Sequence, residues 1–208
     1  MPTRARERLL VTAEELFYAE GVRAVGVERI LGRSGVGRAS FYRHFPGKDD
    51  LVVAVLRRGD QAWRTWLAER VTALGGEALN VFDALAERFA RADFRGCAFI
   101  NAMVATADPD SAAHRVAATH KERVTSYVVE LLAESGHPGG EGLARELVLL
   151  MDGAMVTALR ERTTTPAHRA RAMAAVLLDQ GSGRPDPPSD GRSRRPGIRL
   201  LPRSIADG

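Results

Sequence analysis

The stretch that decides the fold runs from Gly26 to Leu51 and reads GVERILGRSGVGRASFYRHFPGKDDL. Its apolar residues recur at helical spacing in two short segments, over about 27–34 and 38–44. Gly35 stands between the segments and allows a tight turn, because glycine adopts positive φ without strain. Two short helices joined by such a turn at a steep angle form a helix-turn-helix.

The second short segment has one buried and one outward face. Phe41 and Phe45 lie one helical turn apart, so we expect both rings to pack into a core rather than to stack on a ligand. The remaining polar and basic side chains then point mostly outward: Arg38, Ser40, Tyr42, Arg43 and His44. A second helix with such a face is typical of helix-turn-helix proteins, which place it in the major groove of DNA.

On either side of this stretch the chain reads as helix. Apolar residues at spacings of three and four predict further helices over about 3–20, 48–74, 77–92, 97–106, 110–135, 141–162 and 166–180. No segment alternates polar and apolar residues as a strand would. We therefore expect an all-α fold of about nine helices, with a three-helix head over residues 1–47 and a helical body over residues 48–180.

Composition narrows the class of protein further. From residue 181 Gly, Pro, Ser, Arg and Asp dominate, which predicts a disordered basic tail over 181–208. The single cysteine, Cys97, excludes an intramolecular disulfide and a multi-cysteine metal site. No apolar run approaches the roughly 18–20 residues of a membrane span, and the charged start lacks a signal peptide's apolar segment. We expect a soluble cytoplasmic protein that needs no membrane, metal or other cofactor.

Charge is unevenly distributed along the chain. Residues 1–48 carry nine basic and five acidic side chains, whereas residues 49–180 carry 15 basic and 18 acidic ones. The last 28 residues carry six arginines and three aspartates. A basic head on an acidic body favours a polyanionic partner at the head.

The stretch resembles the DNA-binding domain of the TetR family of regulators. The family pattern I-A-x-x-A-G-V-x-x-x-x-[LF]-Y-x-H-F-x-x-K-x-x-L is matched by Ile30, Gly35, Val36, Phe41, Tyr42, His44, Phe45, Lys48 and Leu51. The close match covers about the first 50 residues; beyond it only the helix count and a short R-G-C-x-x-x-N-A element at 95–102 agree. Leu31 and Ser34 replace the family's usual alanines, and Gly26 stands near a position where threonine often caps the helix.

The resemblance implies roles for individual residues. Tyr42 and Lys48 would contact DNA phosphates, and His44 would do the same or serve as a capping or packing residue. Arg38, Ser40 and Arg43 would read base edges, since an arginine fork matches O6 and N7 of guanine; the alternative for each is a solvated surface residue.

The long helix over 48–74 lines a ligand cavity in TetR-like folds. The resemblance therefore makes Trp63 and Trp66 candidates for pocket lining, with ordinary core or interface tryptophans as the alternative. The same two interpretations apply to four apolar residues further along: Phe82, Phe89, Phe99 and Met103. Cys97 is either a redox sensor or inert packing.

The segment over 143–159 is apolar nearly all round, which predicts that the last two helices pair with their symmetry mates in a dimer. Our hypothesis is a homodimeric repressor that binds a palindromic operator in double-stranded DNA and is released by an unidentified small molecule. It is not expected to be an enzyme, since nucleophile-elbow, phosphate-loop and zinc-protease motifs are missing. One alternative is a DNA-binding dimer without an inducer, acting as an architectural or protein-interaction factor. Another, an enzyme on a helical scaffold, would need a pocket with convergent titratable groups.

Overall fold

The computed structural model describes residues 4–106, 108–137 and 140–180, and the tail predicted over 181–208 lies outside these residues. The described residues form nine α-helices and no strand, which confirms the all-α prediction. The helices are α1 (Arg4–Glu20), α2 (Val27–Ser34), α3 (Arg38–His44), α4 (Lys48–Ala73), α5 (Asn80–Phe89), α6 (Ala98–Thr106), α7 (Ala112–Glu134), α8 (Glu141–Glu161) and α9 (Thr165–Gln180).

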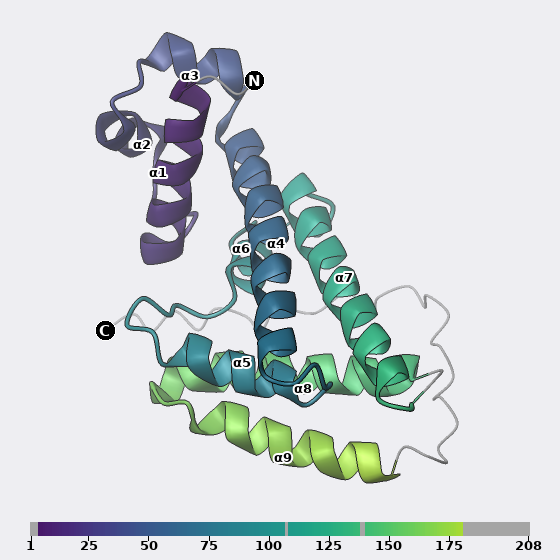
Figure 1. Cartoon of the computed structure of the whole chain (residues 1–208). Coiled ribbons are helices and arrows are strands. Elements are labelled where there is room, and N and C mark those ends of the chain that lie inside the picture. The colour runs from purple at the N-terminus through teal and green to yellow at the C-terminus, as the bar shows by residue number, and fades with distance from the viewer. Residues whose placement is uncertain (1–3, 107, 138–139, 181–208) are drawn as a thin grey trace, which may run out of the picture.

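The long helix α4 connects the two ends of the molecule (Figure 1). Helices α1, α2 and α3 form a head at one end, and α5, α8 and α9 lie at the other end. Helix α7 packs along α4, and α6 packs against α7 on the far side of α4 in this view. Any tilt of α4 therefore moves the head relative to the distant helices.

The head has its own apolar core. Leu9, Ile30, Phe41 and Leu51 are completely buried and hold α1, α2, α3 and the start of α4 together. This core continues beyond residue 47, since the apolar residues on the first half of α4 belong to it: Leu51, Val52, Val55 and Leu56. Arg58 on α4 pairs with two carboxylates of α1, Glu7 and Glu14, so α1 is tied to α4 by charge as well as by packing.

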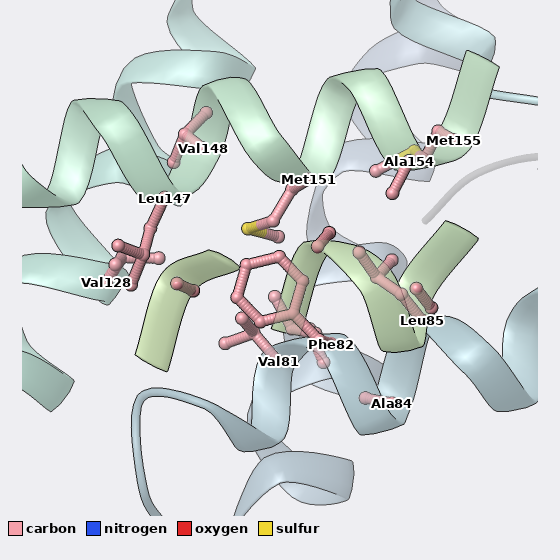
Figure 2. Packing of buried hydrophobic residues seen from close by; sticks show 14 of the residues in the cluster. Val81, Phe82, Ala84, Leu85, Val128, Leu147, Val148, Met151, Ala154 and Met155 are labelled. Carbon is pink, nitrogen blue, oxygen red and sulfur yellow. The ribbon is translucent and has the colours of Figure 1, made fainter. Parts of the chain in front are cut away.

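The second core lies among α5, α7, α8 and α9. Figure 2 shows Phe82 of α5 facing Met151 of α8, while Leu147 of α8 meets Val128 of α7. Phe82, Val128 and Leu147 are completely buried, and Met151 is nearly so. Burial of side chains of this size contributes about 1.5–3 kcal/mol each relative to the exposed state. This core holds the end of the molecule that is farthest from the head.

Helix α5 is shorter than the spacing of its apolar residues predicts. The prediction began at residue 77, but Gly75 and Gly76 adopt positive φ of 126° and 79°, and the chain turns until Asn80. The Asn80 side-chain oxygen accepts a hydrogen bond from the Glu77 backbone N–H at 2.9 Å. This bond gives a backbone N–H of the turn before the helix its hydrogen-bond partner. The spacing of the apolar residues does not reveal it. No helix among the described residues is both long and apolar enough to cross a membrane.

Candidate nucleic-acid interface and ligand cavity

The turn between α2 and α3 depends on a left-handed glycine. Gly35 has φ 62° and ψ 27°, and its N–H donates to the Leu31 carbonyl oxygen at 2.9 Å, which ends α2. A Cβ at this position would lie 2.7 Å from a guanidinium nitrogen of Arg8. That guanidinium donates to the Ser34 carbonyl oxygen, so α1 braces the turn from outside. The angle between α2 and α3 is therefore set by backbone conformation and by a contact from the first helix.

Helix α3 is short and has defined ends. Gly37 precedes it in an extended conformation, and its carbonyl oxygen accepts from the N–H groups of Ser40 and Phe41 at 3.0 Å each. At the other end Phe45 is extended, with φ −138°, as expected for a residue before proline. Seven residues, Arg38–His44, make up the whole helix.

The buried and outward faces of α3 are those that the sequence predicts. Phe41 and Phe45 are 0% and 3% exposed, which confirms that both belong to the core. Arg38, Tyr42 and Arg43 are exposed, whereas three further predicted contact residues are half-buried: Ser40, His44 and Lys48. All six lie on α3 or at the first position of α4, at the head end of the molecule (Figure 1). The structure thus brings the six predicted DNA-binding residues together on one short segment.

Arg38 has a partner that sequence reasoning missed. Its guanidinium forms an ion pair with the Glu28 carboxylate of α2. Both side chains remain more than half exposed, at 62% and 69%, so the pair is worth about 0–1 kcal/mol. So weak a pair leaves the Arg38 guanidinium available to another partner.

Arg6 is a second basic residue of this end that the sequence did not single out. Its guanidinium lies over the Phe45 ring, 5.4 Å from the ring centroid. The only signal for it in the sequence is membership of the basic first segment, because tertiary packing alone places α1 beside the end of α3.

A cavity of about 1180 Å³ lies where the head meets the body, lined by residues of α1, α4, α5, α6 and α8 and by the segments after α1 and before α6. Trp63, Trp66 and Phe99 are among its lining residues. The other predicted pocket residues lie elsewhere. Phe82 and Phe89 are 0% and 7% exposed and belong to the distant core, while Met103 packs on the core of the head.

A buried polar cluster joins α4 to α7 close to this cavity. His120 of α7 and Asp60 of α4 are 2% and 4% exposed, and the His120 Nδ1 lies 2.8 Å from a carboxylate oxygen of Asp60. Arg64 and Arg123 bond to the same carboxylate. The His120 ring also stacks on Phe99, with centroids 3.6 Å apart and planes inclined by 9°.

The protonation states in this cluster follow from burial and hydrogen bonding. Burial lowers the pKa of His120 from 6.5 to about 4, although the bond with Asp60 partly opposes this. Burial also raises the pKa of Asp60, but its bonds from His120, Arg64 and Arg123 together outweigh that effect and hold the pKa below 3.8. At neutral pH a neutral His120 therefore donates its Nδ1–H to an ionised Asp60.

The sequence carried almost no signal for this cluster. His120 stands 60 positions from Asp60, and an isolated aspartate on a long helix is usually a surface residue. No group of three or more histidine, cysteine or acidic residues in the described part of the chain could hold a metal ion.

Comparison with known proteins places the chain among bacterial regulators. Residues 9–55 match the model of the family described as "Bacterial regulatory proteins, tetR family". The transcriptional activator FasR of Mycolicibacterium smegmatis is 42% identical over 53 residues, which make up 26% of this chain and only 24% of FasR.

Solved structures extend the likeness to nearly the whole chain. SCO4454, a TetR-family transcriptional regulator from Streptomyces coelicolor, is 35% identical over 88% of this chain and 92% of that chain, with a TM-score of 0.77. A TetR-type regulator from Streptomyces avermitilis is 27% identical over 86% and 98% of the two chains, with a TM-score of 0.73. With its braced helix-turn-helix and the nine helices of its described residues, the chain belongs to the TetR family of transcriptional regulators.

Proposed function

We propose that this protein is a homodimeric repressor that binds a palindromic DNA operator through α2 and α3 and is released by a small molecule. The observation that carries the proposal is the outward face of α3, a short helix held at a fixed angle with its arginines exposed. Such a helix fits the major groove, which is the only groove that distinguishes all four base pairs. A regulator of this kind acts on chromosomal DNA, and hence in the cytoplasm.

The residues divide into two kinds of DNA contact. Arg38 and Arg43 read base edges, because they lie on the exposed side of α3, and the half-buried Ser40 does so beside them. Tyr42, His44 and Lys48 contact phosphates and fix the position of α3 along the groove. With this division of contacts, the protein would be a sequence-specific regulator rather than a protein that binds DNA through charge alone.

Dimerisation is supported by apolar side chains that the monomer leaves uncovered on two adjacent helices. Leu149 and Val156 of α8 are 72% and 58% exposed, and Met173 and Val176 of α9 are 57% and 52% exposed. Gly153 lies between the two α8 residues with no described atom within 4 Å of its ideal Cβ position, so a neighbouring helix can approach closely. Helices α8 and α9 pack on each other. A two-fold symmetric four-helix contact would cover this face.

Release by a small molecule is supported by the cavity beside Trp63, Trp66 and Phe99. Its walls belong to the head and to the body, so an occupant can favour one head position over another. A DNA-binding dimer without an inducer would have no use for such a hollow, and the cavity therefore favours the ligand-responsive regulator over the architectural factor.

In vitro selection of bound sequences from random DNA tests the DNA-binding part of the proposal. We expect a palindromic site whose half-sites are separated by about 34–36 Å or a multiple of it, as the dimer's symmetry requires. The Arg43→Ala variant should lose preference at one position of each half-site, whereas the control Arg57→Ala, an exposed arginine on α4, should select the same site. Selection of an asymmetric site, or of none, would contradict the proposal.

A reporter gene behind the selected site separates repression from activation. We expect transcription to fall when the protein is supplied and to recover when the effector is added. A rise in transcription on supplying the protein would make it an activator, as the relative FasR is named.

A further inference from the structure

The cavity at the junction of head and body has a chemistry of its own. We propose that it binds an anionic amphiphile, a small molecule with an apolar body and one carboxylate or phosphate group, which touches the head directly. This inference rests on the proposed ligand-responsive function and names the class of ligand. The volume of about 1180 Å³ exceeds the roughly 300–1,000 Å³ of most ligand pockets, so an elongated molecule would fit.

The apolar half of the ligand follows from uncovered apolar side chains. Val11 of α1, Val104 of α6 and Leu159 of α8 are 38%, 75% and 41% exposed, and all three line this cavity. The other large apolar residues that stand exposed in the described part of the chain are Tyr42 on the proposed DNA face and four residues on the proposed dimer face. An apolar ligand in the cavity would cover Val11, Val104 and Leu159, which neither DNA nor a second copy of the chain would cover.

The negative half follows from the charged residues of the wall. Every acidic residue of the lining already has an arginine partner: Glu14–Arg58, Glu15–Arg33, Glu20–Arg29 and Asp93–Arg91. Three lining arginines, Arg23, Arg88 and Arg95, have no carboxylate within ion-pair distance among the described residues. The charged side chains of the lining that have no ion-pair partner are therefore all arginines, which suits an anion and disfavours a cation.

A glycine in the middle of α4 helps to keep this space open. Gly59 lines the cavity, and no described atom lies within 4 Å of its ideal Cβ position. Glycine is unfavourable in a helix interior, so its presence needs a local reason. A larger residue here would project from α4 into the hollow.

Two of the three arginines, Arg23 and Arg95, make hydrogen bonds that join the head to the body, and Arg88 lies beside one of these bonds. Arg23, just after α1, donates from Nε to the Ala105 carbonyl oxygen of α6 at 2.6 Å. The Arg95 backbone N–H donates to the Tyr18 hydroxyl of α1 at 2.9 Å, and the Arg88 guanidinium lies 6.0 Å from the centroid of the Tyr18 ring. An anion that draws Arg23 or Arg88 to itself competes with these bridges. Ligand binding would thereby change the position of the head without any rearrangement of the body core.

Calorimetric titration tests the ligand class with four compounds that share one chain length: decanoate, decyl phosphate, 1-decanol and decyltrimethylammonium, each below its micelle concentration. We expect the two anions to bind at least tenfold more tightly than the alcohol and the cation. Tighter binding of decanoate or of decyl phosphate identifies the natural group as a carboxylate or a phosphate. Equal affinity for all four compounds, or no binding of the anions, overturns the inference.

Variants locate the site. Arg88→Gln should weaken anion binding at least tenfold and leave the binding of 1-decanol unaffected. The control is Arg57→Gln, which changes an exposed arginine of α4 that does not line the cavity, and it should change the binding of neither. Gly59→Phe should abolish binding of every compound by filling the hollow. Circular dichroism melting of each variant identifies any that fails to fold, and retention of binding by a folded Gly59→Phe variant overturns the assigned place.

Operator binding by the same samples distinguishes the failure of this inference from that of the proposed function. If the protein binds its selected operator but no anion binds or releases it, the ligand class is wrong and the DNA-binding function stands. If anions bind in the cavity and no operator is ever found, the ligand class holds and the proposed function fails.

Discussion

At the scale of single residues, the head uses two physically different kinds of basic side chain. Arg43 lies on the exposed face of α3, whereas Lys48 begins α4 and is half-buried. A planar guanidinium can form two parallel hydrogen bonds to a guanine edge, and an ammonium acts on phosphate as a point charge. We expect substitutions at these two positions to differ in kind.

Arg43→Ala should cost roughly 1–3 kcal/mol on the operator and relax the preference at one base position, because a bidentate contact is lost. Lys48→Ala should weaken binding to all sequences alike and reduce the slope of log affinity against log salt by about 1. Fluorescence anisotropy with operator and scrambled duplexes, at several salt concentrations, measures both effects. Equal weakening of both duplexes by Arg43→Ala would show that Arg43 does not read bases.

Acid should destabilise the protein through His120. Its pKa is about 4 in the folded protein and near 6.5 when unfolded, so the unfolded chain binds more protons between these values. The contribution is fully present above pH 6.5 and is lost as the pH falls toward 4, with a slope of up to about 1.4 kcal/mol per pH unit. Urea unfolding of the wild type and of His120→Gln, which can still donate to Asp60, measures the difference.

The expected result is a shallower pH dependence for His120→Gln between pH 6.5 and 4. Asp60 adds acid sensitivity of the same sign, because its lowered pKa makes its contribution disappear as the pH falls below about 4. Identical slopes for the two proteins across the upper window would mean that His120 is not the group that takes up the proton.

At the scale of elements, α2 contains one glycine, Gly32, and is ended by a second, Gly35, and the two have opposite conformational needs. Gly35 ends the helix at φ 62°, where a side chain is strained, whereas Gly32 lies inside the helix with no described atom within 4 Å of its ideal Cβ position. An alanine at a left-handed position costs roughly 1–2 kcal/mol, and an alanine in place of an interior glycine stabilises a helix by about 1 kcal/mol.

Gly35→Ala should therefore lower the free energy of unfolding by at least about 1 kcal/mol and weaken operator binding, because it also displaces Arg8 from its place beside the turn. Gly32→Ala, in the same helix, should raise stability by a similar amount and leave the operator site unchanged. Chemical denaturation and anisotropy measure the two quantities. A neutral Gly35→Ala would mean that the turn does not need its left-handed conformation.

At the scale of the whole molecule, the apolar face of α8 and α9 should determine the oligomeric state. Leu149→Glu places a carboxylate in the proposed interface, at the most exposed of its apolar side chains, where it would be buried without a partner. We expect the dimer dissociation constant to rise by a factor of about 100 or more, which corresponds to about 2.7 kcal/mol. Sedimentation velocity over a concentration series measures it.

Val104→Glu is the matched control, since Val104 is 75% exposed and lies on α6, outside the exposed apolar face of α8 and α9. This variant should sediment as the wild type does. A Leu149→Glu protein that remains as dimeric as the control would show that α8 and α9 are not the interface.

Local chemistry in the sequence was enough to predict the order of the helices and the helix-turn-helix of the head. A glycine between two short apolar patterns, aromatic residues one turn apart and a proline after the second helix all act over a few positions. The nine helices of the part of the chain that the structure describes, the buried Phe41 and Phe45, and the exposed arginines of α3 could therefore be predicted. The boundaries of α5 could not, because a side-chain bond from Asn80 sets its start.

The tertiary structure alone decided which apolar and charged residues meet. Helical periodicity shows that Phe82 and Trp63 belong to apolar faces. It does not show that Phe82 faces Met151 in a dense core, whereas Trp63 lines a cavity. The Asp60–His120 pair spans 60 positions, and the cavity takes its walls from α1, α4, α5, α6 and α8. Such contacts depend on how separate helices pack, whereas a sequence pattern reports only the face that each helix turns away from water.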